Sequence, residues 1–284
     1  MTKREGGSLF VIPALILLSL VTIYPIIYVF YLSLHRRLLI FNISKFVWFE
    51  NYLFLLNDNR FWNAFKNTIY FTVVSVSLEL LIGLFVAVLL NRAFRLKGLM
   101  RAVILIPWAI PTVVSARMWE WMYNTDFGIL NYVLGSEINW LGSPFWAMNA
   151  AIFMDVWKTT PFVAILLIAG LQVIPHEVYQ AARIDGAGGW TIFRRITLPL
   201  LKPVILVVLI FRTFDAFRVF DAVYVLTGGG PANTTETLSI YAYKVLFQTL
   251  QFGYGSTLSV VVFLCTGIIS IFYIRILSRG EKPA

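Results

Sequence analysis

Long apolar stretches alternate with short polar ones along almost the whole chain of 284 residues. A helix needs roughly 20 apolar residues to cross the hydrocarbon core of a bilayer, and six stretches reach about that length. We expect these spans at about 9–34, 68–90, 102–123, 145–171, 203–226 and 254–277. Each should be helical, because a segment exposed to lipid must satisfy its own backbone hydrogen bonds. The pattern predicts an all-α polytopic membrane protein.

The first stretch is expected to stay in the mature protein, since it is too long for the apolar core of a signal peptide and no small-residue cleavage site follows it. Composition agrees with a membrane protein, because 59% of residues are apolar and only 13% are charged. The net charge of +9 does not indicate nucleic acid binding. Its basic residues stand in small groups beside apolar runs, where they set orientation and meet anionic lipid. The single cysteine, Cys265, excludes an intrachain disulfide.

The basic residues also predict orientation. If the amino terminus is cytoplasmic, the short flanks on the inner side hold thirteen Lys and Arg and those on the outer side six. The inner set is Lys3, Arg4, Arg92, Arg95, Lys97, Arg101, Arg183, Arg194, Arg195, Lys202, Arg275, Arg279 and Lys282, and the outer set is Arg36, Arg37, Lys45, Arg60, Lys66 and Lys244. The bias favours a multi-pass protein of the cell membrane with both termini cytoplasmic.

A polar, glycine-rich segment, EVYQAARIDGAGGWTIFRRITLPLLKP at 177–203, separates the fourth and fifth spans. Pro175 suits the first position of a short helix over 176–184. Ala181 and Ala182 would give this helix a face small enough for another protein's backbone to approach closely. The glycines at 186, 188 and 189 allow the positive φ angles of a turn that ends it. We expect a docking surface, and an ordinary loop without a partner is the alternative.

A second short helix should follow that turn. Apolar side chains recur at helical spacing at 190, 193, 196 and 200, with Arg194 and Arg195 on the flank. This is the amphipathic pattern of a helix that lies at the membrane surface. Pro199 and Pro203 are expected to mark the bend into the fifth span.

Charged residues also occur inside the predicted spans. The fifth reads FRTFDAFRVFDAVYVL, with Arg212, Asp215, Arg218 and Asp221 three apart and alternating in sign. Neighbours at this spacing touch on a helix, so the charges can pair. The fourth span carries Asp155, Lys158, Thr159 and Thr160. Charges facing lipid cost several kcal/mol, so these should face a bundle interior or a wet cavity. They either bind a substrate, with Trp157, Phe162, Phe214 or Phe217 as aromatic faces, or form an ion-pair network that fixes helix packing.

Several motifs resemble one family. Gln180-Ala181-Ala182, Gly186 and Ile196-x-Leu198-Pro199 resemble the EAA signature of permeases in binding-protein-dependent ABC importers. Further motifs extend the resemblance over almost the whole chain to the carbohydrate-uptake branch of the type I importers. These are Tyr24-Pro25, Asn51-Tyr52, Pro107 with Pro111, Trp157-x-x-x-Pro161, and Thr227-Gly228-Gly229-Gly230-Pro231. The combination of VWKTTPF with FRTFDAFRVFDAVYVLTGG is most similar to the trehalose/maltose permeases, which implies a disaccharide.

The resemblance implies one permease domain over 1–284, with the first span and outer loop at 1–67, a core of five spans at 68–277 and a coupling segment at 173–199. The coupling helix of the family fits a cleft in a separate ATPase. On that basis the coupling residues are Gln180, Ala181, Ala182, Asp185, Gly186 and Ala187. Gln180 replaces the glutamate of the signature, so an ion pair at this position is in doubt. The family's sugar-contacting positions fall on Lys158, Thr159, Phe162, Arg212, Asp215, Ala216 and Val219.

The implied partners are two ATPase subunits, a second and different permease chain, an external sugar-binding protein, the sugar and membrane lipid. ATP and Mg²⁺ would bind the ATPase, because this chain has no G-x-x-x-x-G-K-[ST] loop to cradle phosphates. Gly228–Pro231 is expected outside, either meeting the binding protein or forming a plain turn.

Other interpretations remain open. Glu79, and Arg117 with Glu120, either add to the cavity or form internal pairs. Glu79, Asp155 and Asp215 could instead serve an ion-coupled secondary transporter. An intramembrane enzyme is disfavoured, because the two histidines, His35 and His176, fall at opposite membrane faces.

Overall fold

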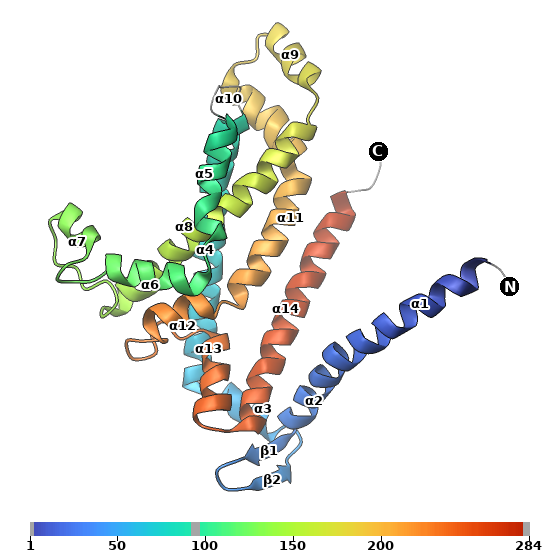
Figure 1. The fold of residues 1–284 in the computed structure, drawn as a ribbon, viewed down its shortest axis with the longest axis vertical. Helices are drawn as coiled ribbons and strands as arrows, with labels where there is room; N and C mark the ends of the chain where they lie inside the picture. Colours follow the sequence, from blue (N-terminus) through green and yellow to red (C-terminus); the bar gives the residue numbers. More distant parts are fainter. Residues whose placement is uncertain (1–2, 92–96, 281–284) are drawn as a thin grey trace. The chain divides into compact units, whose positions relative to one another are not determined.

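The computed structural model describes residues 3–91 and 97–280, and side chains over 11–91 and 98–276. Two compact units make up the chain. Unit 1 comprises 1–62 and 238–265, and unit 2 comprises 63–237 and 266–284. Of the basic residues counted for orientation, Arg92, Arg95 and Lys282 lie outside the described residues. Each unit is built mainly from helices (Figure 1).

Unit 1 begins with a continuous helical run to Ser33. Its parts are α1 (Lys3–Leu18), one π-helical turn η1 (Ser19–Ile23) and α2 (Tyr24–Ser33). A short antiparallel hairpin of β1 (His35–Leu38) and β2 (Ile43–Phe46) follows, and these are the only strands among the described residues. The remaining elements are α3 (Glu50–Leu56), α13 (Leu238–Tyr243), the π-helical turn η3 (Lys244–Gln248) and the first part of α14 (Phe252–Gly280). The strands lie in the predicted outer loop, where the sequence pattern predicted no regular structure.

The Asn51-Tyr52 motif joins α3 to the end of α2. The Asn51 side-chain amide donates to the carbonyl oxygens of Ser33, at 2.8 Å, and His35, at 3.0 Å. The hydroxyls of Tyr52 and Ser33 lie 2.8 Å apart. These bonds satisfy carbonyls that are left without helical partners where α2 ends. The motif therefore fixes the point at which the chain leaves the first span.

Unit 2 holds the remaining helices, and α4 and α14 run from one unit into the other. Its elements are α4 (Asn59–Asn91), α5 (Lys97–Ala109), α6 (Thr112–Met122), α7 (Ile129–Leu134), α8 (Pro144–Val173), α9 (His176–Ile184), α10 (Gly189–Ile192), the π-helical turn η2 (Phe193–Thr197), α11 (Leu198–Phe217) and α12 (Asp221–Thr227). Figure 1 shows α8 in yellow-green between α5 and α11. In the most apolar 18-residue stretch of α8, 72% of the residues are buried, so α8 is the central helix of unit 2.

Helices α4, α8 and α11 pack closely around an apolar core. The core includes Ala87, Leu167 and Leu201, one from each helix. Two glycines permit the close approach. A Cβ added at Gly83 would lie 2.6 Å from Val163 Cγ1, and one added at Gly170 would lie 2.7 Å from Val204 Cγ2. Small residues of this kind let helix backbones pack tightly where water supplies no driving force.

Five helices among the described residues are long and apolar enough to span a membrane: Val11–Ser33, Asn59–Asn91, Pro144–Val173, Gly189–Phe217 and Phe252–Ile276. These confirm five of the expected spans. The stretch expected as one helix over 102–123 instead forms α5 and α6, which are bent by 90° at a short break. Pro111 supplies the reason, because proline has no N–H to continue the helical ladder and disfavours a helical conformation at the residue before it.

The fifth span also differs from expectation at both ends. Helical residues run without interruption from Gly189 to Phe217, so Pro199 and Pro203 do not separate a surface helix from the span. Leu198 N–H bonds back to Phe193 O in the wide π turn, just before Pro199. The helix ends at Phe217, before the expected limit at 226, and α12 begins at Asp221. Arg218 and Asp221 are therefore not on one helix with Arg212.

Candidate functional site

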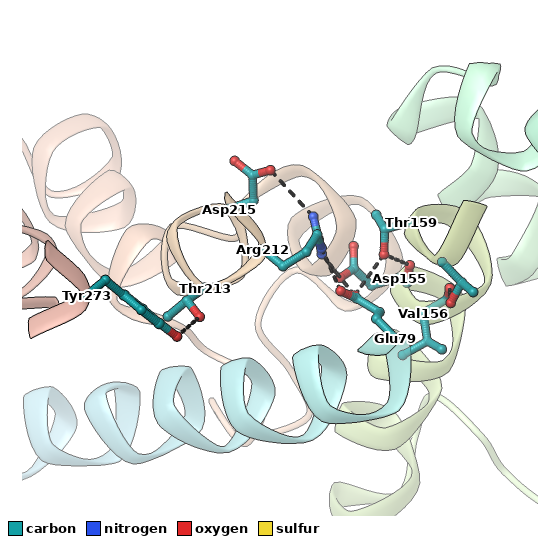
Figure 2. Close-up of polar contacts among 9 residues, drawn as sticks. Glu79, Asp155, Val156, Thr159, Arg212, Thr213, Asp215 and Tyr273 are labelled. Carbon is teal, nitrogen blue, oxygen red and sulfur yellow. Dashed lines mark hydrogen bonds and ion pairs between the residues drawn. The ribbon is translucent and has the colours of Figure 1, made fainter. Parts of the chain in front are cut away.

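A guanidinium and a carboxylate meet inside unit 2. Arg212 on α11 donates from Nε to Glu79 Oε2, at 2.5 Å, and from Nη2 to Glu79 Oε1, at 2.9 Å (Figure 2). Glu79, on α4, is fully buried and Arg212 is 5% exposed. Two parallel bonds are the strongest form of an arginine–carboxylate pair. The pair holds α4 against α11 through residues that are far apart in the sequence.

Helix α8 adds a second carboxylate and a hydroxyl to this pair. Asp155 Oδ2 lies 3.2 Å from Arg212 Nη2. Thr159 Oγ1 lies 2.7 Å from Glu79 Oε1. Because both side chains are nearly buried, the low dielectric around them strengthens these contacts and makes an unpaired member costly. We call Glu79, Asp155, Thr159 and Arg212 the polar cluster.

Asp215 lies at the open edge of the polar cluster. Figure 2 shows it on the other side of the Arg212 guanidinium from Glu79 and Asp155. Its carboxylate is 3.5 Å from Arg212 Nη1 and 3.7 Å from Arg218 Nη2, and its side chain is 58% exposed. Each arginine of this segment thus pairs with an aspartate at i,i+3 spacing, as predicted, and both share Asp215. Among the described residues Asp221 forms no ion pair with Arg218.

Lys158, one turn from Asp155 on α8, is directed to the break between α5 and α6. Its Nζ donates to Ile110 O at 3.0 Å and lies 3.4 Å from Trp108 O. Pro111 cannot supply the N–H that would normally continue the helix here. The ammonium therefore occupies the negative end of α5, where a cation is favoured. The predicted site residue Lys158 thus binds the backbone between the two prolines of the Pro107 and Pro111 motif.

Aromatic rings lie beside this break. Trp108 stacks on Phe162 with centroids 5.7 Å apart, and Phe211 meets Phe162 edge-on at 6.5 Å. Trp108 and Phe211 are each about half exposed. Of the other aromatic candidates, Trp157 packs against Trp119 and Phe217 is 2% exposed.

The remaining predicted sugar positions are buried in the chain. Ala216 is 2% exposed and Val219 is 9% exposed. The Val219 carbonyl oxygen accepts a bond from Thr237 Oγ1 at 3.1 Å. The structure thus brings Thr159, Arg212 and Asp215 together, places Lys158 and Phe162 at the helix break, and leaves Ala216 and Val219 as packing residues around the end of α11.

Glu79 is the site residue whose role was hardest to predict from the sequence. Its position inside an apolar span indicated an internal pair, but nothing identified its partner. Arg117 and Glu120, which were expected either to add to the cavity or to form an internal pair, pair with each other at 2.6 Å in an exposed position. Among the described residues no group of three or more His, Cys, Asp and Glu is arranged to hold a metal ion.

The segment after α8 forms the predicted short helix, since α9 spans His176–Ile184. Its end is a Schellman motif, with Ala187 N–H bonded to Ala182 O at 2.9 Å and Gly186 N–H bonded to Arg183 O at 3.1 Å. Gly186 has a φ of +77°, which explains the glycine at this position. Gly188 and Gly189 do not use positive φ. The motif separates α9 sharply from α10.

The exposed face of α9 differs in part from the face expected for docking. Gln180, Ala181 and Asp185 are exposed, but Ala182 is 8% exposed and packs within the chain. Gly186 is exposed and Ala187 is partly buried. Ile184 is 86% exposed and adds an apolar side chain to this face, which the motif did not single out. Behind α9 a cavity of about 740 Å³ is lined by side chains that include Tyr179 and Thr197.

The Gly228–Pro231 loop is held by hydrogen bonds of its own. Thr235 Oγ1 donates to Gly230 O at 2.8 Å, and Thr234 Oγ1 donates to Pro231 O at 2.6 Å. Gly228 and Gly229 both have positive φ. The geometry is that of a well-fixed turn.

These features define a helical membrane protein with a buried polar cluster, an adjacent open carboxylate and a short helix displayed between two spans. The family model described as "Binding-protein-dependent transport system inner membrane component" matches residues 79–282. The chain belongs to this family. The match begins at Glu79 and includes the polar cluster, the helix break and α9.

Relatives cover almost the whole chain. The chain is 45% identical over 278 residues to the trehalose/maltose transport system permease protein MalF of Thermococcus litoralis, covering 96% of this chain and 94% of the relative. It is 39% identical over 288 residues to the trehalose transport system permease protein SugA of Mycobacterium tuberculosis, covering 100% and 93%.

One solved structure, of a bacterial alginate ABC transporter in complex with alginate pentasaccharide-bound periplasmic protein, contains a similar chain. The TM-score is 0.86 at 21% identity, covering 99% of this chain and 97% of the other. This likeness supports the fold of an ABC transporter permease.

Proposed function

We propose that the chain is the permease subunit of an ATP-driven importer, and that Asp215 and the neighbouring aromatic rings form its part of a sugar path. The observation that carries the proposal is the open carboxylate of Asp215 beside an otherwise buried ion-pair cluster. Phe211, half exposed, stands four residues before Asp215 on α11, so both occupy one face of the helix. A carboxylate accepts hydrogen bonds from sugar hydroxyls, and aromatic rings cover the apolar face of a sugar.

The charged residues inside the spans were expected either to bind a substrate or to form an ion-pair network, and in this proposal different residues take the two roles. Glu79 and Asp155 pair with Arg212 and serve mainly to hold α4, α8 and α11 together. Asp215 is held at Nη1 of the same guanidinium and is free to bind substrate. Lys158 keeps the break between α5 and α6 in place, and Phe162 supports the exposed Trp108 ring.

The sugar is a disaccharide such as trehalose or maltose. Support comes from the relatives at 45% and 39% identity, a trehalose/maltose and a trehalose transport system permease, which match this chain over almost its full length. An external binding protein would deliver the sugar, and a second, different permease chain would complete the path.

The driving force would come from two separate ATPase subunits, which bind ATP and Mg²⁺. Helix α9 is the docking element, and Ala181, Ile184 and Asp185 are its exposed contacts. Gln180 keeps a hydrogen-bonding side chain at the position of the signature glutamate. With α9 docked on the ATPase in this proposal, α9 and both termini would lie in the cytoplasm. The ion-coupled alternative is not favoured, because the family is one of binding-protein-dependent permeases and all three of its candidate carboxylates pair with Arg212.

The docking role can be tested with Ile184→Asp in the assembled transporter reconstituted in proteoliposomes. A charge at an apolar docking contact should weaken coupling by at least tenfold, measured as trehalose or maltose uptake per ATP hydrolysed. Val133→Asp is the matched control, since Val133 is also a β-branched apolar residue, 72% exposed, but lies on α7, outside the coupling segment and the candidate spans. Equal coupling in the parent and the Ile184 variant would contradict the docking assignment.

A further inference from the structure

An apolar groove in unit 1 has an arginine in its wall. The groove has a volume of about 310 Å³ and lies between α2, η3 and the first turns of α14. Most of its lining is apolar, including Val29, Leu32, Leu246 and Phe252, and Arg37 from β1 completes it. The volume is at the lower end of the range of about 300–1,000 Å³ typical of ligand pockets. The groove therefore runs from apolar side chains of the first membrane span to the Arg37 guanidinium just beyond the end of that span.

Arg37 differs from its neighbour Arg36 in having no counter-ion among the side chains that the structure describes. Arg36 forms an ion pair with Glu50 on α3. Among the described residues no acidic side chain lies within ion-pair distance of Arg37, and its cross-strand neighbour is the neutral Ser44. Arg37 is nevertheless half-buried. Partial burial of a guanidinium without a counter-charge is unfavourable, so an anion is expected there.

The surroundings of the groove indicate that the anion is a lipid. In the span that contains α2, only 6% of the most apolar 18-residue stretch is buried by protein, and in the span formed by α14 only 17% is. Most of both surfaces is therefore open to lipid. The hairpin that carries Arg37 also exposes Ile40 and Phe41 by 64% and 70%. Apolar and aromatic side chains near the end of a span are typical of the membrane interface. A guanidinium forms strong charge-assisted hydrogen bonds to a phosphate, including that of a lipid headgroup.

We propose that this groove is a binding site for an anionic phospholipid. One acyl chain lies in the groove against Leu32 and Phe252, and the phosphate pairs with the Arg37 guanidinium. The lipid would thereby join α2 to α14 within unit 1 at the surface of the bilayer. This site is independent of the sugar path.

Lipid binding to the delipidated full-length complex, followed by native mass spectrometry, tests the proposal. The probes are phosphatidylglycerol and phosphatidylcholine with identical acyl chains. We expect phosphatidylglycerol to bind more tightly and Arg37→Gln to lower its affinity about fivefold, as expected for one basic residue at an anionic headgroup. Arg37→Lys should retain most of the affinity. The matched control is Arg36→Gln combined with Glu50→Gln, which removes a neighbouring cation together with its partner and should leave the affinity within about twofold.

Ser259→Phe provides a second variant, because it fills the groove and leaves Arg37 in place. It should lower retention of both lipids, and it decides the question if the Arg37 variant does not fold, as judged by thermal melting. Unchanged phosphatidylglycerol affinity in both variants would overturn the proposal, as would equal affinity for the two lipids. Displacement of the lipid by an equal concentration of inorganic phosphate would show a site for a free anion instead. Loss of a partner subunit with unchanged lipid binding would assign the groove to a protein contact.

Discussion

Two carboxylates associated with α4 are removed from water in different ways. Glu79 is fully buried within the span and is neutralised by Arg212. Asp58, directly before α4, is half-buried and accepts hydrogen bonds of 2.5 Å from both Tyr241 and Tyr254. Its other oxygen accepts the Arg60 N–H at 2.9 Å, as a helix N-cap does.

The difference follows from where each carboxylate lies along the span, since Glu79 is inside it and Asp58 is at its end. Inside the span no water can solvate a carboxylate, so only an opposite charge makes ionisation tolerable. Next to the helix end, neutral phenol donors and backbone N–H groups are sufficient. Burial raises the pKa of Asp58, but the bonds from Tyr241 and Tyr254 outweigh it and hold the pKa below its ordinary value of 3.8. Variants that remove a partner should therefore affect the two sites differently.

Removal of Glu79 should have the largest effect. Glu79→Ala leaves the Arg212 guanidinium buried with one carboxylate fewer, and breaking such a pair costs about 3–5 kcal/mol. We expect a large loss of folded protein in detergent, measured by thermal melting. The triple variant Glu79→Leu, Asp155→Leu and Arg212→Leu should recover most of that stability, because both buried carboxylates are removed together with their counter-charge. Equal destabilisation by the single and triple variants would contradict the pairing.

Asp58 should contribute less and should show a pH dependence. Asp58→Ala leaves two phenol donors without their acceptor, at a cost of about 1–3 kcal/mol. Because the folded-state pKa is lowered, the stabilisation by the ionised carboxylate is complete above about pH 3.8 and is lost as the pH falls through the folded-state value. Melting temperature should therefore fall more steeply in the parent than in Asp58→Asn below that pH. Parallel curves for the two proteins would exclude Asp58 as the titrating group.

Asp215 should have the smallest effect on stability and a large one on transport. Its side chain is 58% exposed, so Asp215→Asn should change the free energy of unfolding by less than about 1 kcal/mol. We expect sugar uptake to fall at least tenfold while the complex still assembles. The exposed pair of Arg117 and Glu120 gives the control, since Glu120→Gln should alter neither stability nor uptake appreciably. Unchanged uptake kinetics in Asp215→Asn would assign Asp215 to the structural network.

The sequence was sufficient for features that depend on neighbouring residues. Apolar length predicts the spans, because a helix in lipid must satisfy its own backbone and present apolar side chains over the full thickness of the bilayer. Pro175 and Gly186 similarly predict the limits of α9, since they act through local backbone conformation. The permease family was also evident from motifs along the chain.

Tertiary structure decided what depends on distant residues. The partner of Glu79 is 133 positions away, and the two meet in a bundle where the glycines at 83 and 170 let α4, α8 and α11 approach closely. The helix break at Pro111 could be suspected from proline, but its stabilisation by Lys158 could not. Ala182 likewise could not be assigned from the motif alone, because its burial depends on how α9 packs against the rest of the chain. Local pattern determines which elements form, whereas packing determines which of their side chains remain free to bind.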